Sequence, residues 1–187
     1  FLSKYPEEES ARQAENPCWH IHQGKPPESD IPLNFAMLLN LASVCNTENK
    51  EVLWGFISRY APNASPEKNL MLDQLVGFAI RYYQDFVKPE KFYRAPNKQE
   101  AAALESLATV LDGTAPDADA SELQTQVYEV GKEHGFENLR DWFKACYEVL
   151  FGQTQGPRMG SFIALYGVAK SASLIRRALS GEDLAKG

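Results

Sequence analysis

The feature that most constrains the fold is a helical repeat of apolar residues, which runs through most of the chain without any long alternation of apolar and polar positions. The repeat is clearest between residues 66 and 87 and holds for about four turns, at Leu72, Leu75, Val76, Ala79, Ile80, Tyr83, Phe86 and Val87. Residues at this spacing share one face of a helix, whereas a strand would need a period of two. We therefore expect an all-α protein.

Helix boundaries can be placed from proline, glycine and capping residues. Residues 32–45 are apolar on almost every face, which predicts a buried helix with Pro32 near its first turn. Ser65 and Pro66 have the order of an N-cap followed by a first-turn proline, so the longest helix is expected to begin there. Two further pairs have the spacing of a capping box, namely Asn97 with Glu100 and Ser121 with Gln124. The result is an irregular bundle of about seven or eight helices joined by short loops.

Residues 1–30 are set apart from the remainder by proline and polar residues, and we expect an irregular connecting segment there. Residues 31–187 form the predicted helical domain, with two sub-bundles and a boundary near residues 96–120 as an alternative to one body. The chain starts with Phe1 rather than methionine, which leads us to expect a piece of a longer protein.

Composition and charge limit the classes of function that this chain can have. The net charge is −6, which argues against generic charge-driven nucleic-acid binding but leaves room for a local basic patch. No apolar run has the roughly 18 residues of a membrane span, so no membrane partner is expected. Three cysteines are too few for a disulfide framework and favour a reducing compartment, the cytoplasm.

Catalytic and metal-binding patterns are weak. Cys18, His20 and His22 lie close together, but the second half of a metal site is missing and the spacing is poor, so we predict no metal. Cys146 falls on the apolar face of a helix, where a structural thiol is the expected role. The sequence has no nucleophile elbow and no phosphate-binding loop, so we predict no catalytic residue and no cofactor in this chain.

A glycine-rich stretch from Gly152 to Gly167 is the first candidate for recognition. Pro157 can occupy the first turn of a helix whose free N–H groups attract acceptor atoms, and Arg158 can bind a phosphate or a base edge. Gln153 and Gln155 can read bases through their amides. The alternative is a simple turn between packed helices, with Arg158 paired to an acid, and the residues alone favour that alternative.

A second candidate follows the long helix. Four of its residues interleave cations with an aromatic ring and form a candidate basic and aromatic patch: Lys88, Lys91, Tyr93 and Arg94. Aromatic rings between cations suit unpaired bases beside their phosphates. The more common alternative is a solvated loop beside core residues.

Four blocks, "IPLNFAMLLNLASVCN", "EVLWGFISRYAP", "AIRYYQDFVKPEKFYRAP" and "GQTQGPRMGSFIALYG", closely resemble successive blocks in the C-terminal region of class I lysyl-tRNA synthetases. The resemblance implies a helix-cage domain that binds the anticodon of lysine tRNA. It also implies a separate Rossmann-type catalytic domain that uses ATP and Mg. The catalytic HIGH-like and KMSKS-like motifs do not occur here, so this chain alone is expected to be inactive as a lysine–tRNA ligase.

The resemblance also suggests which residues lie near the anticodon loop: Gln153, Gln155, Arg158, Ser161 and Phe162, with Trp142 and Lys144 as neighbours. The expected partners are lysine tRNA and the catalytic domain of the same polypeptide. If this is right, Arg158 and residues 88–94 should join in one positive patch. The alternative function is a helical protein–protein interaction domain without a role in RNA binding.

Overall fold

The computed structural model describes Glu15, residues 17–21 and residues 33–184. The chain divides into two units, residues 1–34 and residues 35–187, and each is described by itself. In the first unit, Pro17–Ile21 form the short helix α2, where the sequence predicted irregular structure. The predicted helix start at Pro32 and the side chains of Cys18 and His22 lie outside the described part.

The second unit confirms the all-α prediction, because its described residues contain helices and no strand. The α-helices are α3 (Phe35–Cys45), α4 (Lys50–Tyr60), α5 (Leu70–Tyr82), α6 (Lys98–Asp112), α7 (Ala120–Glu133), α8 (Leu139–Leu150), α9 (Met159–Tyr166) and α10 (Val168–Leu179). A π-helical turn η2 (Tyr83–Val87) and a 3-10 turn η3 (Lys88–Glu90) extend α5. Within the described ranges, no helix is long and apolar enough to cross a membrane.

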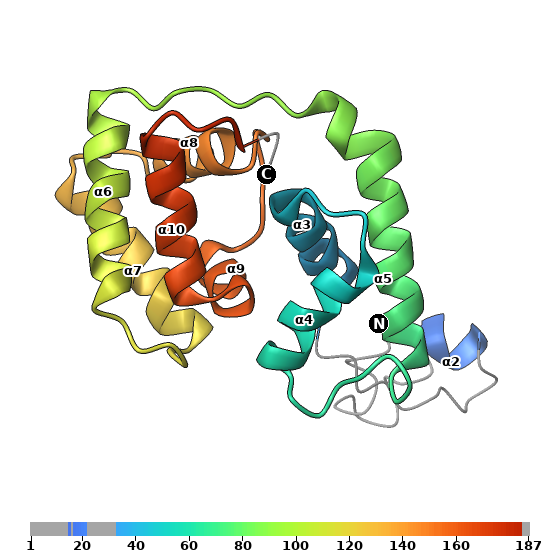
Figure 1. Ribbon diagram of the computed structural model, residues 1–187. Helices are drawn as coiled ribbons and strands as arrows, with labels where there is room; N and C mark the ends of the chain where they lie inside the picture. Colours follow the sequence, from blue (N-terminus) through green and yellow to red (C-terminus); the bar gives the residue numbers. More distant parts are fainter. Residues whose placement is uncertain (1–14, 16, 22–32, 185–187) are drawn as a thin grey trace. The chain divides into compact units, whose positions relative to one another are not determined.

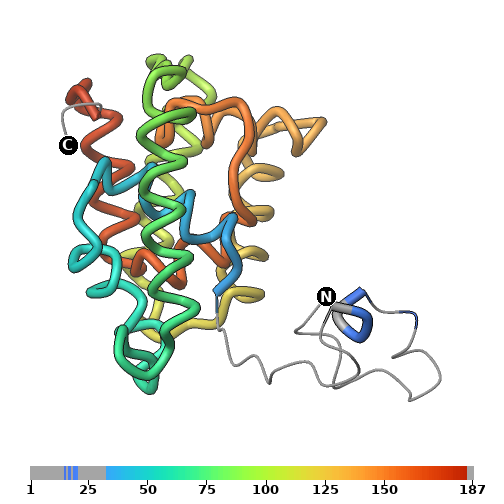
Figure 2. The backbone as a smooth tube through the Cα atoms, turned by 90° about the vertical axis from the view of Figure 1, so that its right-hand side faces the viewer, coloured from blue at the N-terminus to red at the C-terminus, as the bar shows by residue number. Residues whose placement is uncertain are grey.

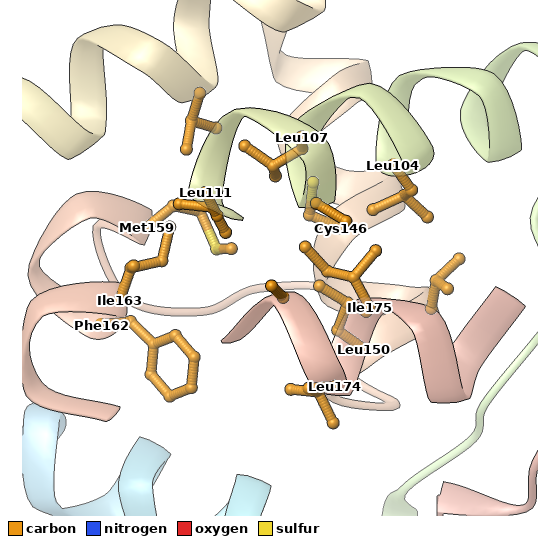
Figure 3. Close-up of a cluster of buried hydrophobic side chains, with 14 of the residues drawn as sticks. Leu104, Leu107, Leu111, Cys146, Leu150, Met159, Phe162, Ile163, Leu174 and Ile175 are labelled. Carbon is orange, nitrogen blue, oxygen red and sulfur yellow. The ribbon is translucent and has the colours of Figure 1, made fainter. Parts of the chain in front are cut away.

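The main core lies among α6 to α10, where α6 packs against α10 and α7 against α9. Its side chains come from the apolar faces of these helices, and Figure 3 shows Leu104 and Leu107 of α6 in one cluster with Ile175 of α10. These residues are almost completely buried. Burial of such large aliphatic side chains is the main source of stability in a helical bundle.

Helix α9 joins this core to the α3–α5 part of the domain. It contacts α3 and α4 on one side and α7 and α10 on the other (Figure 1). Rings continue across the join, since Tyr166 at the end of α9 stacks on Phe56 of α4 with centroids 5.2 Å apart. The sequence MGSFIALY is largely apolar because most of α9 is buried between two packed layers. Ser161, Ala164 and Tyr166 are partly exposed.

Two expected helix starts are wrong and one is confirmed. Asn97 and Glu100 form the predicted capping box of α6. Helix α5, however, begins at Leu70 and not near Ser65, because the Asn69 side chain accepts the Ser65 N–H and closes a separate turn. Helix α7 is capped by Asp119, two residues before Ser121, the predicted cap.

Candidate nucleic-acid interface

The glycine-rich loop begins where α8 ends. Helix α8 closes at Leu150, and Gly152 turns the chain with a φ of +66°, a conformation that glycine adopts without a steric penalty. The N–H of Gln153 donates back to the Tyr147 carbonyl at 3.2 Å. The loop is therefore fixed to the helix end by backbone hydrogen bonds.

The two candidate segments from the sequence lie next to each other. After η3, residues 91–97 are extended and cross from the α5 side to α6, as Figure 1 shows. The N–H of Phe92 donates to the carbonyl of Gly152 at 2.9 Å. The ring of Tyr93 covers Gly152 so closely that an added Cβ would lie 3.0 Å from it. Residues about sixty positions apart in sequence thus share one surface.

A pocket of about 420 Å³ opens between these two segments. It is lined by Phe86, Val87, Glu90, Phe92, Arg94, Glu148, Gly152, Gln153, Thr154 and Gln155. We call it the loop pocket. Phe92 is 76% exposed and Phe86 is 62% exposed, so both rings are open to solvent. The structure therefore brings Gln153 and Gln155 together with two exposed aromatic rings.

Phe86 was expected on the buried face of the long helix, and that prediction is wrong. The π-helical turn over Tyr83–Val87 contains more residues per turn than an α-helix and shifts the helical register. Tyr83 stays fully buried, whereas Phe86 points to solvent and packs against Tyr82 with centroids 4.9 Å apart. No residue pattern in the sequence indicated this turn.

Two cations of the basic and aromatic patch are already paired with acids of the domain. Lys88 binds Glu48 at 2.9 Å. Arg94 binds Glu148 at 2.6 Å and holds both oxygens of Glu100, at 2.7 and 2.8 Å. The Arg94 guanidinium keeps the pKa of the Glu100 carboxyl below its usual value. The partly buried Arg94 pairs stabilise the domain, whereas the Lys88 pair is exposed and contributes little to stability. Both cations are already paired, which leaves little charge for phosphates.

Lys91 is held inside the domain. Its ammonium group donates to the Ser43 carbonyl at 2.7 Å and to Asn46 Oδ1 at 2.8 Å, and it lies 4.9 Å from the centre of the Tyr93 ring. Burial lowers the pKa of Lys91 to about 8 and raises the pKa of Tyr93 to about 12. Lys91 therefore anchors the extended segment to the end of α3.

Two residues expected near the anticodon loop lie in the core. Trp142 is fully buried and donates its indole N–H to the Val127 carbonyl at 2.9 Å. Phe162 packs edge-on against Phe151 at 4.8 Å and points into the cluster shown in Figure 3. Neither side chain is accessible to RNA in this structure. Ser161 is half-buried, and the exposed Lys144 lies 3.6 Å from Glu148.

Gly156 in the loop and Gly160 in the first turn of α9 permit close packing. A Cβ at Gly156 would lie 2.5 Å from a carbon of the Tyr147 ring. A Cβ at Gly160 would overlap the Ala120 carbonyl, and the Gly160 N–H donates to Gln124 Oε1 at 2.8 Å. Gln124 thus binds α9 rather than its own helix end, contrary to the capping-box prediction. At these positions the packing explanation of the glycines is sufficient.

The side chain of Arg158 is not held by the described part of the domain, in contrast to those of Lys88, Lys91 and Arg94. It is the N-cap of α9, which starts at Met159, so Pro157 lies before the helix and not in its first turn as expected. The Tyr147 hydroxyl fixes the Pro157 carbonyl at 2.8 Å. The Arg158 side chain is exposed and pairs with no acid in the described ranges. It remains available to an external anion.

The two thiols that the structure describes, Cys45 and Cys146, are poorly reactive. Cys146 is completely buried, and burial raises the pKa of its thiol. Burial also raises the pKa of Cys45 to about 12. A thiol with a raised pKa carries little of the reactive thiolate. Over the described residues, no group of three or more His, Cys, Asp and Glu side chains could hold a metal ion.

Comparison with known proteins places this chain beside aminoacyl-tRNA ligases. Its matches are lysine–tRNA ligases: it is 50% identical over 183 residues to that of Roseobacter denitrificans, covering 98% of this chain and 34% of the relative. The lysine–tRNA ligase of Rickettsia bellii is 45% identical over 181 residues, which is 96% of this chain and 35% of the relative. No family model matches. The chain therefore spans about a third of the length of these relatives.

Proposed function

We propose that this chain is the anticodon-binding part of a class I lysine–tRNA ligase in the cytoplasm. It would bind lysine tRNA, while a catalytic domain elsewhere in the polypeptide would use ATP and Mg to join lysine to it. The similarity to one third of lysine–tRNA ligases supports this assignment. On its own the chain would not activate lysine.

The observation that carries the proposal is the contact between Phe92 and Gly152. It joins the extended segment to the glycine-rich loop and creates a surface with open aromatic rings and amides beside the loop pocket. Stacking platforms and hydrogen-bonding side chains are what proteins use to bind single-stranded RNA loops. Arg158, exposed at the end of the same loop, supplies a cation for the RNA backbone.

The acidic character of the chain affects the expected affinity. With a net charge of −6 and with Lys88 and Arg94 paired internally, few phosphate contacts are available. Non-specific affinity for nucleic acid comes mainly from such contacts. We therefore expect weak general RNA binding, and discrimination that depends on bases.

Substitution of Arg158 in the full-length ligase tests this function. Arg158→Ala should raise the KM for tRNA several-fold and leave the KM for lysine and ATP unchanged, because only tRNA reaches this loop. Arg140→Ala is the matched control, since Arg140 is also exposed but lies at the start of α8, about 15 Å of helix away from the loop. An equal loss in lysine activation measured without tRNA would contradict the proposal.

A second candidate is a protein-interaction domain. The outer face of α5 presents a row of exposed apolar side chains, Met71, Phe78 and Tyr82. Contiguous apolar surface of this kind is typical of protein interfaces. This candidate would gain support if Phe78→Ala weakened assembly of the full-length ligase and Arg158→Ala did not change its use of tRNA.

A further inference from the structure

We propose that the loop pocket holds one unpaired RNA base, turned out of its stack, against the rings of Phe86 and Phe92. The inference rests on the proposed function and adds to it a ligand class and the ring of Phe86, which the sequence had placed on a buried face. A volume of about 420 Å³ falls within the usual range for small-ligand sites.

The charges of the pocket favour a base over a phosphate. Its cation, Arg94, is occupied by Glu148 and Glu100. Glu90 and Glu148 also line the pocket and would repel an anion. A neutral, flat group avoids this repulsion and can stack on exposed rings, an interaction that every base can make. The RNA phosphates would then remain outside, near Arg158.

The polar groups of the pocket can read the edge of a base. Gln153, Thr154 and Gln155 together provide amide and hydroxyl groups that donate and accept hydrogen bonds. The buried Ser43 hydroxyl lies 3.5 Å from Gln153 Oε1, which leaves the amide NH₂ for a ligand. A uracil offers two carbonyl acceptors and one N–H donor, which matches this set.

The pocket is formed before any ligand binds. The bond from Phe92 to Gly152 closes one wall, and Lys91 anchors the same segment through its bonds to Ser43 and Asn46. Arg94 fixes the other end to α8 through Glu148. Such preorganisation lowers the entropic cost of ordering the site during binding.

Binding of an RNA stem-loop with the lysine anticodon to the 187-residue chain tests the proposal by fluorescence anisotropy. Phe92→Ala and Phe86→Ala should each weaken binding about 10-fold, as expected for the loss of a stacking partner. Phe92→Trp should retain it. Phe78→Ala is the matched control, because Phe78 is exposed on α5 outside the pocket, and its effect should stay below about twofold. Circular dichroism checks that each variant is folded.

RNA with one abasic position in the loop shows which base the pocket holds. One abasic position in the loop should weaken binding to the wild type about 10-fold and cause no further loss with Phe92→Ala, because the same contact is already missing. If the two losses multiply at every position, the pocket does not hold a base. If the stem-loop binds normally to both alanine variants, the pocket proposal is overturned and the proposed function stands.

Binding of free uridine tests the pocket proposal independently of the anticodon function. The wild type has three tryptophans and is the reference. In Phe92→Trp, saturable quenching of tryptophan fluorescence by uridine beyond that of the wild type, with none by ribose, would support the base pocket even if the stem-loop did not bind. That outcome would contradict the anticodon function alone. Absence of quenching, together with a normally bound stem-loop, would overturn the pocket alone.

Discussion

The aromatic residues of α8 face the core, whereas those on the outer side of α5 face solvent. Trp142 of α8 is fully buried, and Phe78 of α5 is 53% exposed. Among residues 35–184, α5 lies on the right-hand side in Figure 1 and in front of the other helices in Figure 2. Helix α5 has two charged residues in 13 and α8 has four in 12, yet the more apolar α5 is the one that exposes aromatic rings. Composition therefore does not distinguish a stabilising helix from one that presents a surface. The layer in which each helix packs makes that distinction.

The largest expected difference between these regions is in the free energy of unfolding. Trp142→Ala should lower it by about 3–5 kcal/mol, because a large cavity opens and the bond to Val127 is lost. Phe78→Ala should change it by no more than about 0.5 kcal/mol. Urea unfolding of both variants measures the two values. Equal losses would mean that the outer side of α5, which carries Phe78, is packed as tightly as the core, and would contradict the comparison.

Two glycines test the same difference between packed and exposed positions, Gly160 on α9 and Gly55 on α4. Gly160→Ala should cost at least about 1–3 kcal/mol, since the new methyl group overlaps the Ala120 carbonyl where α9 meets α7. Gly55→Ala on α4 is the control, because nothing lies within 4 Å of an added Cβ there. It should stabilise the chain by up to about 1 kcal/mol, through helix propensity. Thermal unfolding compares them, and a tolerated Gly160→Ala would contradict the close packing of α9.

The ion pair between Arg94 of the extended segment and Glu100 of α6 has a smaller, pH-dependent effect on the free energy of unfolding. Glu100→Gln should cost about 1–2 kcal/mol at pH 7, because Arg94 loses one of its two charged partners and keeps Glu148. The pKa of Glu100 is lowered in the folded chain, so its contribution is complete above the usual carboxyl pKa of about 4.3. The contribution disappears as the pH falls through the lowered folded value.

Urea titrations between pH 3 and pH 7 follow this change. The difference between the wild type and Glu100→Gln should shrink toward acid pH. Glu129→Gln, at an exposed position of α7, should cost little at any pH. A difference that stays constant with pH would show that the Arg94 pair does not stabilise the fold through charge.

Local patterns predicted the helical class and the place of Cys146 on the inward face of α8, because a 3.6-residue period depends only on which side meets the core. They also predicted the capping box at Asn97, whose partners lie within one turn. They failed where contacts between residues far apart in the sequence determine the structure. Gln124 binds Gly160, which lies 36 residues away, and no local pattern contains that contact.

The candidate site was predicted only in part, for the same reason. Gln153 and Gln155 were placed correctly in a loop, but their position beside Phe86 and Phe92 depends on a π-helical turn and on the Phe92 to Gly152 bond. The pairing of Arg94 with two acids depends on where α6 and α8 meet. Sequence indicates which residue types are present, and tertiary packing determines which of them remain exposed.

The most direct test of the account is the affinity of the 187-residue chain for a lysine-tRNA anticodon stem-loop, compared with a stem-loop of altered anticodon bases at the same low salt. We predict a preference of about tenfold or more for the lysine anticodon, equivalent to about 1.4 kcal/mol. Indistinguishable affinities for the two stem-loops would contradict anticodon recognition by this surface.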